Sequence, residues 1–347
     1  MTTETMSPLP APETAPPAPA PRWKRRLATA LKAAVSGTLL LVLARRIDWA
    51  ELRGMLDRTD PAWLALAVAA GIAPLAVSTW KWRILLRATG RPLPFGRLFN
   101  LYLAGLFVNN FLPSTIGGDL FRSYEAGKQV GGQEHVLASV FMERFTGLTA
   151  LTAIALVAFA TNLSSFRDPR FALALGAGVL VYVAVALAVA LPGPLAFALR
   201  RFPGGLAGRL IGKLAAVQEA IHDYAGQTRA VVAALALSLL FHLGAMAYIA
   251  VASRAFGIVL PVRTLLVIVP VIMFVTSLPV TIGGLGLMEW AYFFTFGASG
   301  AGGSPGLLVG LLIRANSLLY SLWGGAVYAA RGLRRPPPAE SRRPPGV

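Results

Sequence analysis

Six ionisable side chains that could bind a charged ligand lie in or beside apolar segments of this 347-residue sequence. They are Asp119, Arg122, Glu143, Arg144, Glu289 and Arg314. An ionisable residue inside a membrane segment costs roughly 2.5–3.5 kcal/mol on insertion scales, so such residues are candidates for function. Arginine keeps its charge, and its planar guanidinium binds phosphate through two parallel hydrogen bonds. The residue types therefore predict an anion site formed by the three arginines.

The three carboxylates have two interpretations. They would hold the arginines while the site is empty, or they would meet a cationic headgroup. The alternative is that all six residues form buried ion pairs that fix the register of the helices and contact no ligand.

An eight-residue motif occurs twice, 166 residues apart, as LPSTIGGD from Leu112 and as LPVTIGGL from Leu278. Proline removes a backbone donor and glycine permits rare backbone conformations, so each copy predicts a helix break. Backbone groups freed at membrane depth must line a cavity or be buried in protein. A break repeated in two halves of a chain therefore indicates the binding site of a transporter. The residues expected to shape these turns are Pro113, Gly117, Gly118, Pro279, Gly283 and Gly284.

Polar groups beside the breaks extend the predicted site. Asn109 and Asn110 precede the first copy, where their amides would bond the interrupted backbone or a headgroup. The helices that begin after Gly118 and Gly284 would direct their positive dipole ends towards the same anion. We expect these groups and the three arginines to surround one cavity near the middle of the membrane.

The composition is that of an integral membrane protein. The chain is 56% hydrophobic and only 14% charged, whereas a soluble domain carries about 25% charged residues. It has no cysteine and three scattered histidines, so we expect no metal site and no cofactor. The net charge of +17 comes from basic residues at the ends of apolar segments, where they set topology. We therefore do not expect nucleic acid as a partner.

Apolar segments predict an all-α polytopic fold of about six spanning helices and two re-entrant hairpins. The segments lie near 29–47, 62–80, 97–112, 135–160, 170–191, 230–252, 262–278, 285–298 and 304–330. Basic clusters at 22–26, 81–97, 200–213 and 331–335 should all face the cytoplasm. An even number of crossings between clusters then requires 97–112 to turn back and the second hairpin to enter from the opposite side. The sequence leaves open whether both arms of the second hairpin cross fully.

This arrangement predicts an inverted repeat with halves at about 95–191 and 230–330, joined by a linker over 194–228. We expect one transmembrane domain over 22–332, between disordered tails at 1–21 and 333–347, with both termini in the cytoplasm. Trp80, Lys81, Trp82 and Arg83 are typical of an interfacial anchor. His242, alone in an apolar segment, is interpreted as a packed hydrogen-bonding residue.

Four motifs follow one another along the chain: NNFLP at 109–113, GGDLFR at 117–122, ERFTGL at 143–148 and LPVTIGGLGLME at 278–289. With these motifs in this order, the sequence resembles the flippase-like membrane family related to the transmembrane half of lysylphosphatidylglycerol synthase, also called UPF0104. The resemblance covers about residues 25–332. It implies translocation of a charged lipid between the leaflets of a bacterial cytoplasmic membrane. Because the sequence ends at Val347, we expect no aminoacyl-transferase domain and no synthesis of lysylphosphatidylglycerol.

The expected function is therefore the movement of a charged phospholipid or lipid-linked headgroup between leaflets. The expected partners are membrane lipids with an anionic or aminoacylated headgroup, and a separate lipid-modifying enzyme. Two alternatives remain: a secondary transporter of a soluble anion, and a membrane enzyme or subunit of lipid modification. An enzyme is less expected, because neither Gly-Gly break is followed by the Lys-Ser/Thr of a phosphate-binding loop.

Overall fold

The computed structural model describes residues 22–111, 117–161, 169–190, 215, 218–278 and 280–333, and these residues form helices without a strand. The helices are α1 (Arg22–Ala44), α2 (Trp49–Asp57), α3 (Pro61–Ala70), α4 (Ile72–Ala88), α5 (Phe95–Phe111), α6 (Gly117–Val130), α7 (Gln133–Thr161), α8 (Pro169–Ala190), α11 (Thr228–Arg254), α12 (Val262–Ser277), α13 (Leu287–Ala298) and α14 (Gly303–Leu333), with a short 3₁₀ helix at Asp223–Gly226. The predicted all-α membrane fold is confirmed.

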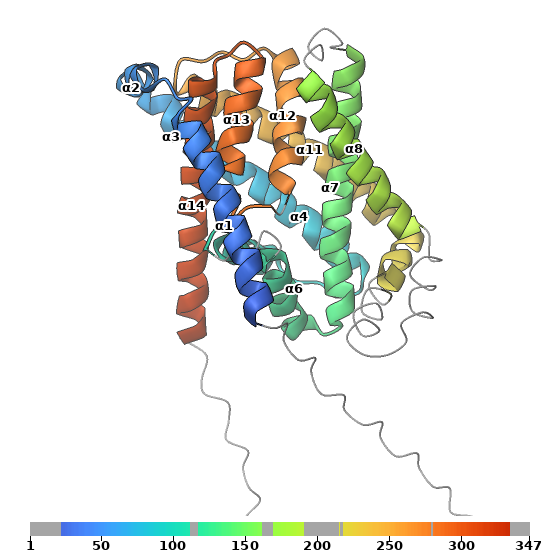
Figure 1. The fold of residues 1–347 in the computed structure, drawn as a ribbon. Helices are drawn as coiled ribbons and strands as arrows, with labels where there is room; N and C mark the ends of the chain where they lie inside the picture. The colour runs from blue at the N-terminus through green and yellow to red at the C-terminus, as the bar shows by residue number, and fades with distance from the viewer. Residues whose placement is uncertain are drawn as a thin grey trace, which may run out of the picture.

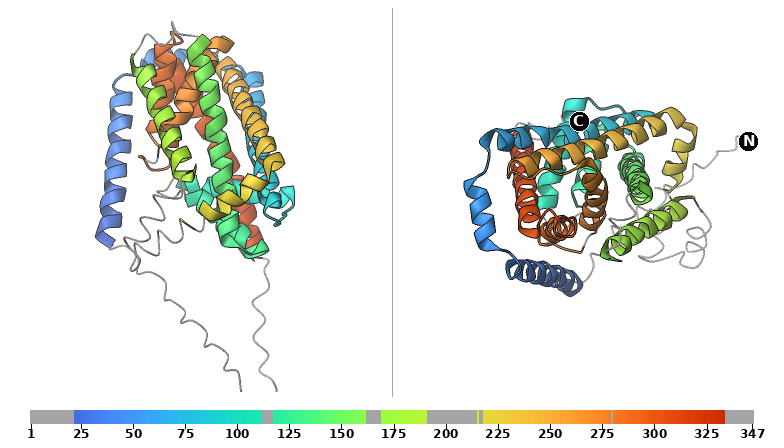
Figure 2. Two further views of the ribbon diagram at one scale, coloured as in Figure 1. Left: turned by 90° about the vertical axis from the view of Figure 1, so that its right-hand side faces the viewer. Right: turned by 90° about the horizontal axis from the view of Figure 1, so that it is seen from above.

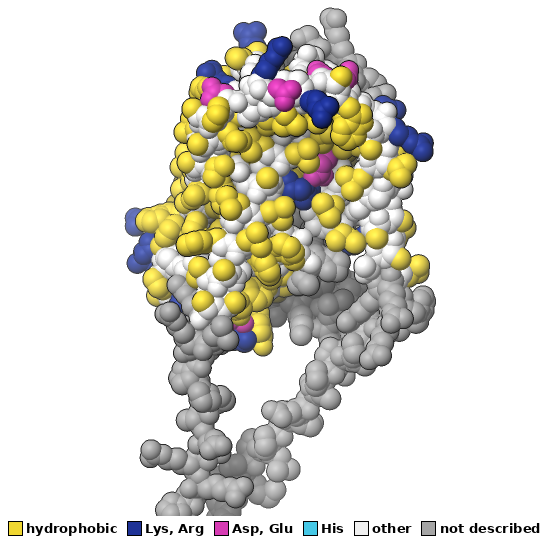
Figure 3. All heavy atoms as spheres, turned by 90° about the vertical axis from the view of Figure 1, so that its left-hand side faces the viewer, with side chains coloured by type: hydrophobic (Ala, Val, Ile, Leu, Met, Phe, Trp, Pro, Cys, Tyr) yellow, Lys and Arg dark blue, Asp and Glu magenta, His cyan; other side chains and the backbone are white. Residues whose placement is uncertain are grey.

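Four helical stretches in the described part of the chain are long and apolar enough to cross a bilayer. They are Pro61–Ala88, Gln133–Thr161, Thr228–Arg254 and Gly303–Ala330. Helices α1 and α8 run beside these stretches in the same bundle (Figure 1). Seen from above, α1 lies at the edge of the bundle (Figure 2). One side view shows hydrophobic side chains over much of the surface, with many of the charged side chains towards the two ends, as a membrane-embedded surface requires (Figure 3).

Two helical hairpins enter the bundle from opposite ends. Helices α5 and α6 lie in the lower half of Figure 1, whereas α12 and α13 descend from the top and turn back inside the bundle. Their arms have 17, 14, 16 and 12 residues in chain order, which is fewer than the roughly 20 residues of a full span. The two hairpins are opposed, as predicted, and both arms of the second hairpin are shorter than a full span.

The described parts of the two hairpins meet inside the bundle. A Cβ atom added at Gly283 would lie 3.2 Å from the backbone oxygen of Asn110. Gly283 and Gly284 have φ angles of +56° and +73°, a region that side chains other than glycine's disfavour. These two glycines therefore shape the second turn. Pro113 and Pro279 lie outside the described residues.

Helix α1 packs against this second turn. Ser36 Oγ accepts a hydrogen bond from the Ile282 backbone N–H at 3.4 Å, and a Cβ atom at Gly286 would lie 3.0 Å from the Ser36 backbone oxygen. Ile268, Val269, Phe296 and Val309 are buried in a core between α12, α13 and α14. This core holds the second hairpin at a fixed depth.

Candidate functional site

The first hairpin brings four predicted residues into one ion cluster, hereafter the first cluster. Arg122 on α6 pairs with Glu143 on α7 (Nη2–Oε2 2.7 Å) and with Asp119 (Nε–Oδ1 3.1 Å). Arg144 donates two hydrogen bonds of 2.9 Å to the two oxygens of Asp119. Asp119 therefore binds two guanidinium groups. Arg122 and Glu143 are almost fully buried, whereas the Arg144 side chain is 58% exposed.

Aromatic rings complete the burial of Arg122. Its guanidinium carbon lies 4.6 Å from the centre of the Trp82 ring and 4.5 Å from that of Tyr102. Arginine over an aromatic face gains a cation–π attraction that grows when water is excluded. The Tyr102 hydroxyl also donates to Glu143 Oε1 at 3.1 Å. Arg122 is thus part of the core, and Arg144 is the exposed member of the cluster.

Asn109 satisfies the backbone of the first hairpin. Its Oδ1 accepts a hydrogen bond from the Gly118 N–H at 2.7 Å, at the start of α6. A Cβ atom at Gly118 would lie 2.1 Å from the Gly105 backbone oxygen, so only glycine permits this approach of α5 and α6. Asp119 occupies the first turn of α6, where the helix dipole favours a negative charge. The dipole end that we predicted for a ligand therefore faces a protein carboxylate.

The second hairpin has an ion cluster of its own, hereafter the second cluster. Arg314 on α14 pairs with Glu289 on α13 and donates to the backbone oxygens of Gly284 (2.9 Å) and Gly283 (3.3 Å). Glu289 Oε2 also accepts the Gly286 N–H at 2.8 Å, directly before α13 begins. Arg314 therefore satisfies carbonyl groups that the helix break leaves free. Nearby, Asn110 donates to the backbone oxygen and hydroxyl of Ser317 on α14, at 3.4 and 3.3 Å.

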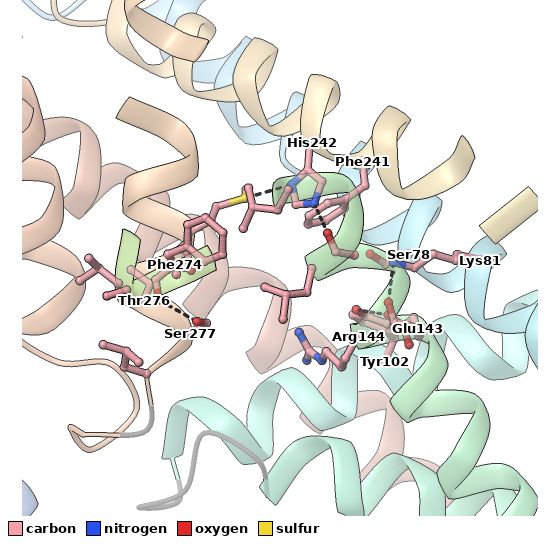
Figure 4. Close-up of a pocket in the computed structure, with 18 residues that line it drawn as sticks. Ser78, Lys81, Tyr102, Glu143, Arg144, Phe241, His242, Phe274, Thr276 and Ser277 are labelled. Carbon is pink, nitrogen blue, oxygen red and sulfur yellow. Dashed lines mark hydrogen bonds between the residues drawn. The ribbon is translucent and has the colours of Figure 1, made fainter. Parts of the chain in front are cut away.

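A cavity of about 520 Å³ opens between α4, α5, α7, α8, α11 and α12 (Figure 4). Its polar end contains Lys81, Tyr102, Glu143 and Arg144, and the Arg144 guanidinium points towards its open centre. Its apolar wall includes Leu148, Leu151, Ala177, Gly178, Phe274, Val275 and Leu278. The cavity thus has charged side chains at its polar end and apolar side chains along its wall.

One face of α7 supplies both ends of this cavity. Arg144, Gly147, Leu148 and Leu151 all line it, and their spacing of three and four residues places them on one side of a helix. At a rise of 1.5 Å per residue, Arg144 lies about 17 Å from the start of α7 and about 26 Å from its end. The polar end of the cavity is therefore deep within the bundle.

The predicted site residues thus occupy two clusters. Glu143 and Arg144 line the cavity, and Asp119 and Arg122 lie directly behind them. Arg314 and Glu289 are paired at the second turn and do not line this cavity. Of the three arginines, only Arg144 lines this cavity.

Lys81 is the functional candidate that we interpreted wrongly from the sequence. We took it for part of an interfacial anchor, but it is only 4% exposed and lines the cavity. Its neighbours Trp80 and Arg83 stack on each other at 5.2 Å, with Trp80 46% exposed, as an anchor would. The helical spacing of Ser78 and Lys81, which share the cavity face, was the signal available in the sequence.

His242 lies on the α11 side of the cavity. Its Nε2–H donates to the Gly147 backbone oxygen at 2.9 Å, and its Nδ1 lies 3.2 Å from the Met273 sulfur. Both ring nitrogens therefore have partners, as expected of a packed residue. Among the described residues, no three His, Cys, Asp or Glu side chains are arranged to hold a metal ion.

Comparison with known proteins agrees with the motifs. The family model described as the lysylphosphatidylglycerol synthase TM region matches residues 29–324. A UPF0104 membrane protein of Methanothermobacter thermautotrophicus is 32% identical over 117 residues, which are 31% of this chain and 35% of that protein. A UPF0104 membrane protein of Methanocaldococcus jannaschii is 30% identical over 95 residues, 27% of this chain and 28% of that protein. The matched segments thus span about a third or less of these relatives.

Proposed function

We propose that this chain, which belongs to the lysylphosphatidylglycerol synthase transmembrane-region family, moves a lipid with a charged headgroup between the two leaflets of the cytoplasmic membrane. Family membership and the membrane fold support a lipid-related role. Movement of the lipid between leaflets is the more specific part of the proposal, and the shape and lining of the cavity support it.

The observation that carries the proposal is the exposed Arg144 guanidinium beside an apolar wall. A lipid needs both environments at once, because its headgroup must be solvated by polar groups while its acyl chains stay in an apolar medium. The wall formed by Leu148, Leu151 and Phe274 begins one helical turn from Arg144. A soluble anion would have no use for this wall, which favours a lipid over the rival transporter function.

The lipid phosphate would bind by replacing Asp119 as the hydrogen-bond partner of Arg144. Arg144 binds Asp119 through Nε and Nη2, and a phosphate could take over one or both of these donors. Asp119 would keep a counter-charge, because Arg122 Nε also lies 3.1 Å from it. Release of the lipid would restore the Arg144–Asp119 pair, so that no unpaired carboxylate remains at either stage.

The opposed hairpins offer a route for alternating access. Their described ends meet at Gly283 and Asn110, so a shift of either hairpin changes which side of the contact is open. With α1 beginning and α14 ending at the same end of the bundle (Figure 1), we propose that this end is cytoplasmic, as the basic residues there require. A separate lipid-modifying enzyme would supply the cargo.

Leaflet-resolved transport in reconstituted vesicles tests the proposal. Purified protein is inserted into vesicles that contain fluorescent phosphatidylglycerol, and a membrane-impermeant reductant bleaches the outer leaflet. We expect the bleached fraction to rise from about half to nearly all in vesicles with the wild type. Arg144→Gln should abolish this rise, and the control Arg53→Met, which removes an exposed charge from α2, should not.

Two results would overturn the proposal. The first is wild-type bleaching of anionic and aminoacylated fluorescent lipids at the level of empty vesicles. The second is Arg144→Gln transport equal to that of the wild type. Uptake of a radiolabelled soluble anion without lipid movement would instead support a secondary transporter, and a chemically altered lipid in the mass spectrum would support an enzyme.

A further inference from the structure

Lys81 is a buried cation without a carboxylate partner in the described part of the structure. Its Nζ donates to the Glu143 backbone oxygen at 2.9 Å and to Ser238 Oγ at 3.0 Å, and it lies 6.0 Å from the centre of the Phe241 ring. All three partners are neutral. No described Asp or Glu oxygen lies within 4.0 Å of Nζ, although only 4% of the residue is exposed.

Such an arrangement is costly without a ligand. A buried charge is ordinarily paired or coordinated, since neutral hydrogen bonds only partly replace water. The Glu143 carboxylate pairs with Arg122 and accepts the Tyr102 hydrogen bond, and neither of its oxygens lies within 4.0 Å of Lys81 Nζ. Among the residues that the structure describes, Lys81 thus has no directly paired carboxylate where its side chain lines the cavity (Figure 4).

The charges around the polar end do not balance. Lys81, Arg122 and Arg144 are cationic, whereas Asp119 and Glu143 are the carboxylates that the structure places with them. One positive charge remains uncompensated. In a low-dielectric setting this excess attracts an anion and repels a headgroup that carries a free ammonium group.

We propose that Lys81 and Arg144 together form the headgroup subsite, and that this subsite selects lipids whose headgroup is a net anion bearing a phosphate. Aminoacylated lipids, whose headgroups carry ammonium groups, are excluded. Lys81 on α4 supplies a buried positive charge, and Arg144 on α7 supplies a guanidinium group that exchanges Asp119 for the phosphate. This inference rests on the proposed lipid function and names the class of lipid that the cavity takes.

Equilibrium binding in nanodiscs of zwitterionic phosphatidylcholine tests the selectivity without requiring transport. The probes are fluorescent phosphatidylglycerol and fluorescent lysylphosphatidylglycerol, each titrated as a minor component against the wild type, Lys81→Met and the control Arg53→Met, which removes an exposed charge from α2. Methionine keeps the unbranched apolar stem of lysine and removes the charge. Glycerol 1-phosphate is added as a soluble competitor, to separate a lipid headgroup from a free phosphate.

We expect the wild type and Arg53→Met to bind phosphatidylglycerol at least tenfold more tightly than the lysylated lipid. Lys81→Met should lose about tenfold to a hundredfold in affinity for phosphatidylglycerol, the range of one charge-assisted hydrogen bond. Affinity for the lysylated lipid should stay the same or rise. Should Lys81→Met fail to give a monodisperse protein, the preference of the wild type alone decides the question.

Equal affinity of the wild type for the two lipids, or a preference for the lysylated one, would overturn this inference and leave the proposed translocation standing. Competition by glycerol 1-phosphate at an affinity equal to that of phosphatidylglycerol would overturn the lipid assignment. A protein that prefers phosphatidylglycerol but moves no lipid between leaflets would keep the subsite and refute the proposed function.

Discussion

Replacement of Arg122 by methionine separates the structural member of the first cluster from the functional one. Arg122 is 1% exposed and pairs with Glu143, which is itself 2% exposed. Methionine retains an apolar stem against the Trp82 and Tyr102 rings but removes the guanidinium. Glu143 then keeps the Tyr102 hydroxyl at 3.1 Å and loses its counter-ion.

The expected cost follows from this burial. Removal of one partner from a buried ion pair destabilises a protein by about 3–5 kcal/mol, because the other charge stays buried and unpaired. The variant also loses the cation–π contacts of Arg122 with the Trp82 and Tyr102 rings, which adds about 1–2 kcal/mol of destabilisation for each contact. Arg144, whose side chain is largely exposed, should cost only about 0–1 kcal/mol on replacement.

The double variant Arg122→Met/Glu143→Gln tests the reason for the cost. Glutamine still accepts the Tyr102 hydrogen bond but carries no charge, so no uncompensated carboxylate remains. Because neutral replacement of a whole buried pair is often nearly free, the double variant should be at least about 2 kcal/mol more stable than Arg122→Met alone. The two effects are therefore strongly non-additive.

Equilibrium unfolding in mixed micelles, followed by tryptophan fluorescence over a denaturing-detergent titration, measures these free energies. Glu143→Gln alone completes the cycle, and Arg53→Met on α2 controls for loss of charge at an exposed site. A cost below about 1 kcal/mol for Arg122→Met, or a double variant whose cost equals the sum of the singles, would refute the reasoning. It would mean that the buried pair is solvated by water or lipid that reaches it.

Two further predictions concern the helix breaks. Gly118→Ala should prevent stable folding, because its Cβ would lie 2.1 Å from the Gly105 backbone oxygen. The control Gly176→Ala, whose Cβ would meet no atom within 4 Å, should leave the thermal midpoint unchanged or slightly higher. Equal yields of folded protein for the two variants would contradict this prediction. Arg314→Lys should speed amide hydrogen exchange across residues 280–287 by about tenfold or more, measured by mass spectrometry. The reason is that an ammonium group cannot bind Glu289 and two backbone oxygens in the planar geometry of arginine. Unchanged exchange in this segment would show that the turn does not depend on Arg314.

The helix breaks and their opposed entry were predictable from the sequence, since both depend on local chemistry and on charge. The Pro and Gly-Gly pattern marks a break wherever it stands, and the lengths of the flanking apolar runs show which segments are too short to span. The partners of Asn109 were not predictable to the same degree. Whether its amide caps α6 or contacts a ligand depends on how closely α5 approaches α6, which the small residue Gly105 decides.

The sequence alone determined that this protein is helical, lies in a membrane, folds around two interrupted hairpins and carries charges at membrane depth, because hydropathy, backbone chemistry and residue type are local properties. It did not determine which charges meet. Tertiary structure paired Arg122 with Glu143, paired Arg314 with Glu289 at the second turn, and placed Lys81 in the cavity without a carboxylate partner among the described residues. The reason is geometric: a charge acquires its environment from neighbours on other helices, and Lys81 meets groups 62 and 157 residues away in the chain.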